Sequence, residues 1–157
     1  METSQKTNRS EIFAYAAWAI ALLATVGSLF FSEVMQFPPC VLCWYQRIAI
    51  YPLVLIVGTG IILRDRRMKH YALPICLSGL FLAAYHNLLY YGIIPETAAP
   101  CTAGASCTET HIEWLGFVTI PLLSLAAFVT MSACLFFIKP PEEISPPTLA
   151  DTPGRER

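Results

Sequence analysis

Four long apolar stretches, almost free of charge, constrain most strongly what this chain can fold into. They cover residues 12–31, 44–63, 71–92 and 114–138, and Arg47 is the one Lys, Arg, Asp or Glu among them. The hydrocarbon core of a bilayer needs about 20 apolar residues per helix. An open chain can satisfy its backbone hydrogen bonds there only as a helix. We therefore predict an all-α membrane protein, a bundle of four transmembrane helices.

The composition supports this class. The chain has 157 residues, of which 55% are hydrophobic and 13% charged, and this is too apolar for a soluble domain of its size. The first stretch resembles a signal peptide because Lys6 and Arg9 precede it. Its apolar run is longer than the usual core of such peptides, and "SLFFSEV" is a poor cleavage site. We interpret it as an uncleaved helix.

Lysine and arginine gather on one side of the predicted bundle. They precede the first stretch, follow the last, and fill the link "RDRRMKH" between the second and third. The two other loops, residues 32–43 and 93–113, contain neither. Cytoplasmic loops carry the excess of these residues. We therefore expect both termini and the middle loop in the cytoplasm, and nothing in this charge pattern suggests nucleic acid.

The chain divides into three segments on this basis. Residues 1–11 form a cytoplasmic N-terminus, and residues 12–138 form the membrane domain. Residues 139–157 hold five prolines and have too little apolar surface to form a packed core, so we predict a disordered cytoplasmic tail.

The predicted topology places four of the six cysteines on the outer side, in two close pairs. The outer pairs are Cys40 with Cys43 and Cys101 with Cys107, and the two single residues inside the membrane are Cys76 and Cys134. We interpret the inner two as small buried hydrophobes. The outer four allow three readings: structural disulfides, a four-thiolate zinc site, or a redox relay. The C-x5-C spacing suits zinc poorly, and disulfides closing such small loops add little stability. A relay is therefore favoured.

The local sequence "FPPCVLCWYQR" supports redox chemistry at the first pair. Pro38 and Pro39 stop any preceding helix and suit a helix start. We predict Cys40 and Cys43 in the first turn of the second helix, where the positive N-terminus favours a thiolate. Arg47 follows Cys43 by four residues and lies one turn deeper on the same face. It would stabilise a Cys43 thiolate, or else extend to the interface as a snorkelling side chain.

Two other side chains are candidates for binding a ligand near this depth. His86 lies about 22 Å along the third helix from its inner end, and is a candidate proton carrier or hydrogen-bond donor. A hydrogen-bonded core histidine is the alternative. Trp44 is a candidate to line a pocket for a flat ring, although aromatic residues at this level also form interfacial belts.

These motifs together resemble a known family. The run "PPCVLCWYQRI", the basic inner loop, "CTAGASC" and "IEWLGFVTIPLLSLAAF" resemble the disulfide bond formation protein B (DsbB) family, most of all its short-loop, BdbC-like members. The resemblance covers residues 13–138. It implies a membrane thiol–quinone oxidoreductase that reoxidises an extracytoplasmic thioredoxin-fold thiol oxidase (DsbA- or BdbD-like). Electrons would pass to a membrane quinone, menaquinone or ubiquinone, in support of disulfide bond formation.

The resemblance also implies residue roles. Cys101 is attacked by the partner, and the released Cys107 attacks Cys40. This frees Cys43 as a thiolate facing the quinone, with Arg47 stabilising the charge. Better-known proteobacterial members separate the second pair by a long loop, whereas here five residues lie between the two cysteines. The choice of Cys101 as the attacked residue is carried over from the family.

Two competing readings remain. One is a small metal-binding or scaffold membrane protein whose outer cysteines hold zinc or static disulfides, but a scaffold has no need of Arg47 beside Cys43. The other is a relative of vitamin K epoxide reductase, but those relatives carry their quinone-facing C-x-x-C on the last helix of the bundle. The favoured reading predicts a multi-pass protein of the cell membrane with its active site on the extracytoplasmic face.

Overall fold

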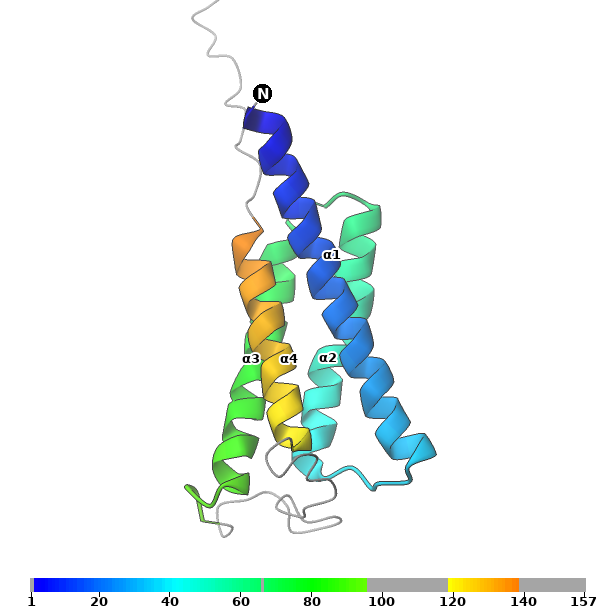
Figure 1. The fold of residues 1–157 in the computed structure, drawn as a ribbon, viewed down its shortest axis with the longest axis vertical. Helices are drawn as coiled ribbons and strands as arrows, with labels where there is room; N and C mark the ends of the chain where they lie inside the picture. The colour runs from blue at the N-terminus through cyan, green and yellow to red at the C-terminus, as the bar shows by residue number, and fades with distance from the viewer. Residues whose placement is uncertain (1, 66, 96–118, 139–157) are drawn as a thin grey trace, which may run out of the picture.

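The computed structural model describes residues 2–65, 67–95 and 119–138, with side chains from residue 9 onward. Four α-helices and one π-helical turn make up most of this described part (Figure 1). The elements are α1 (Glu2–Leu29), η1 (Phe30–Val34), α2 (Val41–Ile62), α3 (Met68–Tyr90) and α4 (Ile120–Phe137).

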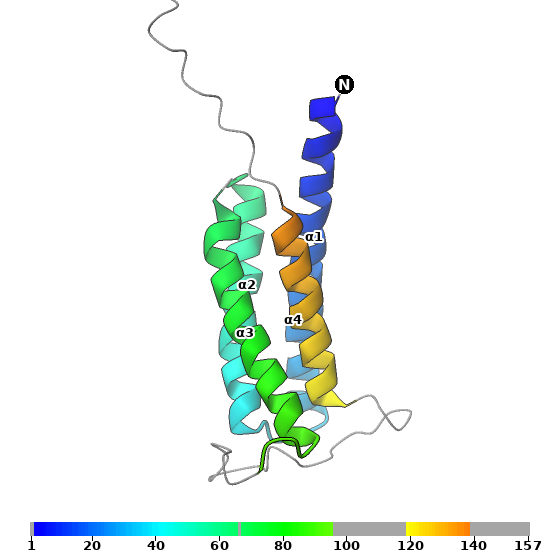
Figure 2. The same ribbon diagram turned by 90° about the vertical axis from the view of Figure 1, so that its left-hand side faces the viewer.

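The helices form a ring in which each one packs against two neighbours. Helix α1 contacts α2 and α4, and α3 contacts the same two. The two ribbon views show the start of α1, the α2–α3 turn and the end of α4 at one end of the bundle (Figures 1 and 2). Each of the four is long and apolar enough to cross a membrane. The predicted four-helix membrane bundle is confirmed for the part of the chain that the structure describes.

The helix ends differ from the predicted spans by a few residues. Helix α1 begins well before residue 12, because the polar N-terminal sequence continues the helix. Helix α2 begins at Val41 rather than at Trp44. Helix α3 ends at Tyr90, where Gly92 adopts φ +71° and the Gly92 and Ile93 N–H groups donate to the Leu89 and Leu88 carbonyls. This is the Schellman arrangement that closes many helices.

The last helix is described from Ile120, with Thr119 as its N-cap. The Thr119 hydroxyl accepts a hydrogen bond from the Leu122 N–H at 3.3 Å, and Pro121 occupies the first turn, where its missing N–H costs nothing. The predicted start at residue 114 falls in a stretch outside the described residues, as does the predicted disordered tail.

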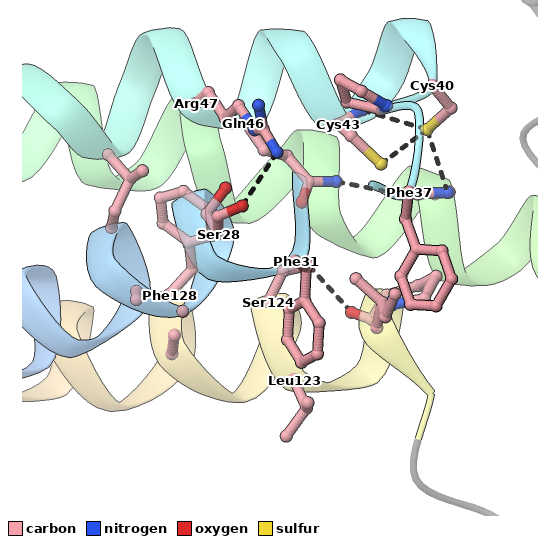
Figure 3. A pocket seen from close by; sticks show the side chains of 18 of the residues that line it. Ser28, Phe31, Phe37, Cys40, Cys43, Gln46, Arg47, Leu123, Ser124 and Phe128 are labelled. Atoms are coloured by element: carbon pink, nitrogen blue, oxygen red, sulfur yellow. Dashed lines mark hydrogen bonds between the residues drawn. The ribbon is translucent and has the colours of Figure 1, made fainter. Parts of the chain in front are cut away.

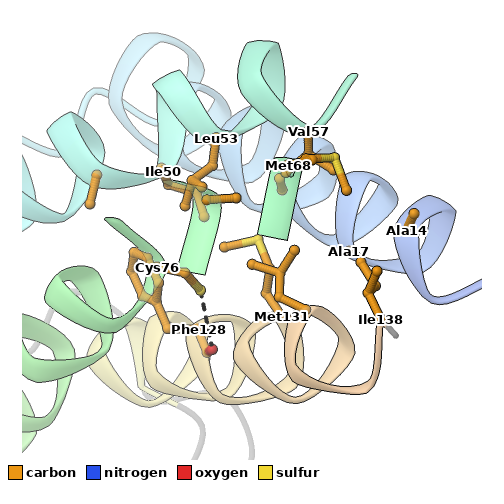
Figure 4. Packing of buried hydrophobic residues seen from close by; sticks show 14 of the residues in the cluster. Ala14, Ala17, Ile50, Leu53, Val57, Met68, Cys76, Phe128, Met131 and Ile138 are labelled. Atoms are coloured by element: carbon orange, nitrogen blue, oxygen red, sulfur yellow. Dashed lines mark hydrogen bonds between the residues drawn. The ribbon is translucent and has the colours of Figure 1, made fainter. Parts of the chain in front are cut away.

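Small side chains allow the helices to approach closely in the core (Figure 4). In α1 the buried positions are Ala14, Ala17 and Ala21. They pack in a cluster with larger residues of the other helices, among them Leu53, Val57, Phe128, Met131 and Leu135. Between lipid-solvated helices there is little hydrophobic driving force, so close packing of small residues stabilises the bundle.

Large apolar side chains cover the outside of the bundle. Leu23, Leu55 and Phe81 are each 72% exposed. An apolar exterior of this extent on a monomer indicates contact with lipid rather than water. Polar contacts also close a helix end. The Lys69 ammonium donates to the carbonyls of Phe136 at 2.8 Å and Ile138 at 3.1 Å, and so satisfies the end of α4.

Candidate active site

A cavity of about 410 Å³ lies between the helices at the end of the bundle where α2 and α4 begin (Figure 3). All four α-helices contribute to its walls, and most of the lining side chains are apolar. The polar or reactive residues lining it are Ser28, Cys40, Cys43, Gln46, Arg47, His86 and Ser124. Four of the predicted site residues therefore line one cavity. They are the cysteine pair Cys40 and Cys43, Arg47 of α2 and His86 of α3.

The two cysteines of the first pair lie at the start of α2, where the chain leaves the Pro38–Pro39 segment. Cys40 is the N-cap of the helix, with extended backbone angles, and Cys43 lies within the first turn. The prediction that both lie inside the first turn is thus off by one position for Cys40. The two sulfurs lie 2.6 Å apart. A disulfide, with its S–S bond near 2.05 Å, needs only a small adjustment at this site.

The helix N-terminus acts on Cys40 rather than on Cys43. The Cys43 backbone N–H donates to the Cys40 sulfur at 3.2 Å, in the manner of an N-cap. The Cys43 thiol contributes most to lowering the pKa of Cys40, burial opposes this, and the contact with His86 lowers it further. The predicted effect of the helix N-terminus is therefore directed at the Cys40 sulfur, which accepts this N–H.

Arg47 crosses the cavity wall to the first helix. One of its guanidinium Nη2–H groups donates to the Ser28 carbonyl at 3.0 Å, and the guanidinium carbon lies 5.3 Å from the centre of the Trp44 ring. Its Nε atom is buried and finds no hydrogen-bond partner among the described residues. A buried donor without a partner is costly. The Arg47 side chain lines the cavity, so a ligand that enters there meets its positive charge.

His86 is almost completely buried, at 2% exposure, and lies between Gln46 of α2 and Cys40, the N-cap of that helix. Its Nε2 is 3.9 Å from the Cys40 sulfur, and its Nδ1 is 3.1 Å from the Gln46 amide nitrogen. The neighbouring Asn87 has a structural contact. Its amide donates to the Ala83 and Pro121 carbonyls, both at 2.8 Å, and links α3 to the start of α4.

The aromatic residues lining the cavity are not the predicted one. Trp44 is 53% exposed and does not contribute to the lining, so its described contact is with Arg47. Phe31, Phe37 and Phe128 line the cavity instead. The sequence reasoning also missed Gln46, although a lone amide in an apolar span was a usable signal.

The two cysteines inside the membrane helices lie away from the cavity, as predicted. Cys76 is fully buried, with its sulfur 3.2 Å from the Ser132 hydroxyl oxygen, and Cys134 packs partly buried against the same core. Neither lines the cavity. Cys101 and Cys107 lie outside the described residues, so their predicted pairing with the first site stays a prediction.

Comparison with known proteins supplies the family. The family model "Disulfide bond formation protein DsbB" matches residues 9–138. The chain belongs to the DsbB family. Probable disulfide formation protein C 1 of Bacillus anthracis is 43% identical over 138 residues, which is 85% of this chain and 96% of that protein. Disulfide bond formation protein C of Bacillus subtilis (strain 168) is 44% identical over 128 residues, or 82% and 93% of the two chains.

A further relative, from Metapseudomonas resinovorans, is a "Probable disulfide formation protein" that is 42% identical over 123 residues, 78% of this chain and 85% of that one. No solved structure gives a significant match. The family resemblance predicted from the motifs is confirmed. Membership of the DsbB family supports a role in disulfide bond formation and an oxidoreductase activity. With the four apolar helices, it also supports a multi-pass membrane protein.

Proposed function

We propose that this DsbB-family chain is a thiol–quinone oxidoreductase. It reoxidises an extracytoplasmic thioredoxin-fold thiol oxidase, of DsbA or BdbD type, and passes the electrons to a membrane quinone. The observation that carries this proposal is the shared cavity. The adjacent sulfurs of Cys40 and Cys43 and the Arg47 side chain line the same cavity.

The cavity suits a quinone in size and chemistry. Its volume of about 410 Å³ lies within the usual range of small-molecule sites. Apolar side chains, among them Phe31 and Phe128, offer surface to a flat ring. The Arg47 guanidinium in the wall carries N–H donors suited to a carbonyl oxygen. A quinone, either menaquinone or ubiquinone, would accept the two electrons and two protons released when two thiols become a disulfide.

Each predicted site residue has its own step in the proposed electron transfer. Cys101 exchanges with the partner's thiolate, and the released Cys107 attacks Cys40, so that the Cys40–Cys43 bond breaks with its electron pair on Cys43. Cys43 lines the cavity and presents this charge to it. Arg47 lies in the same wall and stabilises negative charge there without reorganising, because the Ser28 carbonyl already holds its guanidinium.

The Lys and Arg residues of the loops indicate which side of the membrane the site faces. The cavity is lined by residues at the starts of α2 and α4. Figure 1 shows these helix starts at the end of the bundle opposite the α2–α3 link, whose sequence is basic. If that link is cytoplasmic, as its Lys and Arg content favours, the active site faces the extracytoplasmic side of the cell membrane. A soluble oxidase could reach it there, in a compartment where disulfides persist.

The test is reconstitution. Purified protein in detergent is mixed with a reduced thioredoxin-fold oxidase and a quinone, and quinone reduction is followed by absorbance. Serine in place of any of the four outer cysteines should abolish steady-state turnover. The matched controls Cys76→Ser and Cys134→Ser should retain it, since neither lines the cavity. Turnover near that of the wild type in any of the four outer variants would refute the relay.

One observation favours a second candidate, a metal-binding protein. The ligand atoms of Cys40, Cys43 and His86 lie within 4.8 Å of one another, close enough to hold an ion. This alternative predicts stoichiometric zinc in the purified protein and no quinone reduction. It offers no use for the Arg47 cation beside the sulfurs, so the oxidoreductase remains the favoured function.

A further inference from the structure

Three buried residues from two helices form a continuous polar chain beside the cavity. The Gln46 amide of α2 contacts His86 of α3, and His86 contacts Cys40 at the start of α2. Gln46 is 7% exposed, His86 2% and Cys40 6%. Polar groups this deeply buried are retained where their hydrogen bonds are satisfied. The geometry of these bonds restricts where the histidine proton can lie.

The Gln46 nitrogen can only donate a hydrogen bond. It lies 3.1 Å from His86 Nδ1, so Nδ1 must accept and cannot carry a proton. A neutral imidazole then carries its proton on the other nitrogen, Nε2. That nitrogen is the one 3.9 Å from the Cys40 sulfur. The Gln46 amide therefore fixes the proton of His86 on Nε2, and this N–H group points at the Cys40 sulfur.

We propose that Gln46 is a positioning residue: it holds His86 in the Nε2–H tautomer, which makes Cys40, Cys43 and His86 a thiol-exchange site rather than a metal site. The exchange half of this proposal rests on the proposed function. In exchange, a thiolate attacks one sulfur of a disulfide, the S–S bond breaks, and the electron pair leaves on the other sulfur. In the relay, Cys40 is the sulfur released when the Cys101 thiolate attacks Cys107 and the Cys40–Cys107 bond breaks. The Nε2–H of His86 then stabilises the negative charge on Cys40 as a donor, with no proton transferred.

The proton on His86 Nε2 also explains why these three residues should not bind a metal ion. The trio has the ligand atoms for a soft ion, since all three lie within 4.8 Å. A ligating imidazole needs a lone pair on the metal-facing nitrogen and donates its other N–H, commonly to a carboxylate. Gln46 imposes the opposite arrangement, because its N–H occupies Nδ1 and the proton blocks Nε2. A glutamate at position 46 would accept from Nδ1–H and release the Nε2 lone pair.

The first experiment reads the tautomer directly. The chain has three histidines, so a His70→Gln/His111→Gln background leaves His86 as the only imidazole. Protein labelled with [15N]histidine is examined by NMR in detergent, with its thiols reduced. We expect Nε2 protonated and Nδ1 unprotonated with Gln46, and the reverse in Gln46→Glu. Gln46→Met removes the donor at nearly constant volume and should give a mixture of the two tautomers.

The second experiment titrates the reduced protein with Cd²⁺ and follows thiolate-to-metal absorbance. Partners that hold a ligating histidine typically change metal affinity 10- to 100-fold. We therefore expect Gln46→Glu to bind Cd²⁺ about 10- to 100-fold more tightly than the wild type. Adding His86→Gln to Gln46→Glu should remove this gain, because the third ligand is then lost.

Two results would overturn the proposal. One is a wild-type His86 with its proton on Nδ1, which needs no variant at position 46 and so does not depend on the variants folding. The other is a Cd²⁺ affinity that Gln46→Glu leaves unchanged. Neither measurement uses a quinone or a partner protein. Failure here is therefore distinguishable from failure of the proposed function, which would appear as absent quinone reduction by the wild type.

Discussion

Gly79 sets the position of an aromatic ring in the cavity wall, and adding one methyl group there should impair quinone binding. A Cβ built on Gly79 would lie 2.5 Å from Cζ and 2.9 Å from Cδ1 of Phe128, and closer still to Cε1. Real Cβ contacts under 3.0 Å essentially never occur. To regain ordinary carbon–carbon contact, the ring must move by roughly 1 Å. Phe128 lines the cavity, so the open space beside it receives the displaced ring.

The size of the effect follows from overpacking, which costs about 1–3 kcal/mol in a tight core. In the ligand-free Gly79→Ala protein the ring relaxes into the cavity, so little of this cost should appear as lost stability. A bound quinone would occupy that space, and the cost then falls on binding. We expect the Kd for quinone to rise roughly 5- to 150-fold, measured by quenching of tryptophan fluorescence.

Gly27 provides the matched control, because it also lines the cavity but a Cβ there meets nothing within 4 Å. Gly27→Ala should therefore change the quinone Kd far less. Trimming the ring in a Gly79→Ala/Phe128→Leu double variant should restore much of the lost affinity. The reasoning would be refuted if Gly79→Ala and Gly27→Ala bound quinone equally well while Gly79→Ala alone lost the full 1–3 kcal/mol of stability.

Three further predictions concern Arg47, Cys101 and Tyr71. Arg47→Ala should keep the fold but raise the apparent KM for quinone, and Arg47→Lys should recover only part of it, because an ammonium cannot replace the planar fork; unchanged quinone kinetics would reduce Arg47 to an interface anchor. An oxidase lacking its second active-site cysteine should be trapped as a mixed disulfide on Cys101, shown by mass spectrometry, and trapping at Cys40 would reverse the proposed order. Tyr71 donates to Asp65 at 2.5 Å, and this bond, ahead of the one from the Arg67 N–H, lowers the pKa of Asp65. The stability that this hydrogen bond contributes is fully present above the unfolded-state pKa of Asp65, near 4. It is lost as the pH falls through the lower folded-state pKa of Asp65. Tyr71→Phe should therefore reduce the Tm at pH 7 but not at pH 2, whereas Tyr15→Phe, at an exposed position, should change neither.

The four spans were predictable because a run of apolar residues long enough for a bilayer has no other stable form. Their ends were less predictable, because caps decide them. Cys40 reads in sequence as part of an apolar motif, but its sulfur accepts the Cys43 N–H and ends the extended segment there. Gly92 looked like the end of an apolar run, whereas its positive φ places it beyond the helix. Capping geometry is set by single backbone angles, which hydropathy does not record.

The inward faces were the least predictable feature. A helix that is apolar all round gives no stripe to show which side meets its neighbours. Helical spacing correctly placed Arg47 near the cysteines, but its partner, the Ser28 carbonyl, is on another helix and depends on how the two are rotated. The same rotation turns Trp44 outward and Gln46 inward. Within "CWYQR", the rarer polar residue was the better indicator of the buried face, because an amide in lipid has no partner.

Packing also explains why this cavity lies at the end of the bundle where α2 and α4 begin. In α1 the alanines at positions 14, 17 and 21 are buried in the core, alongside Met131 and Leu135 of α4. Further along, Gly27 and Ser28 of α1 face the cavity, and the described polar contact of α1 with α2 there is the bond from Arg47. Small side chains bring helices together where they interlock and leave space where nothing opposite fills it. The closely packed end therefore holds the bundle, so the cysteine end can admit a ligand without loss of the fold.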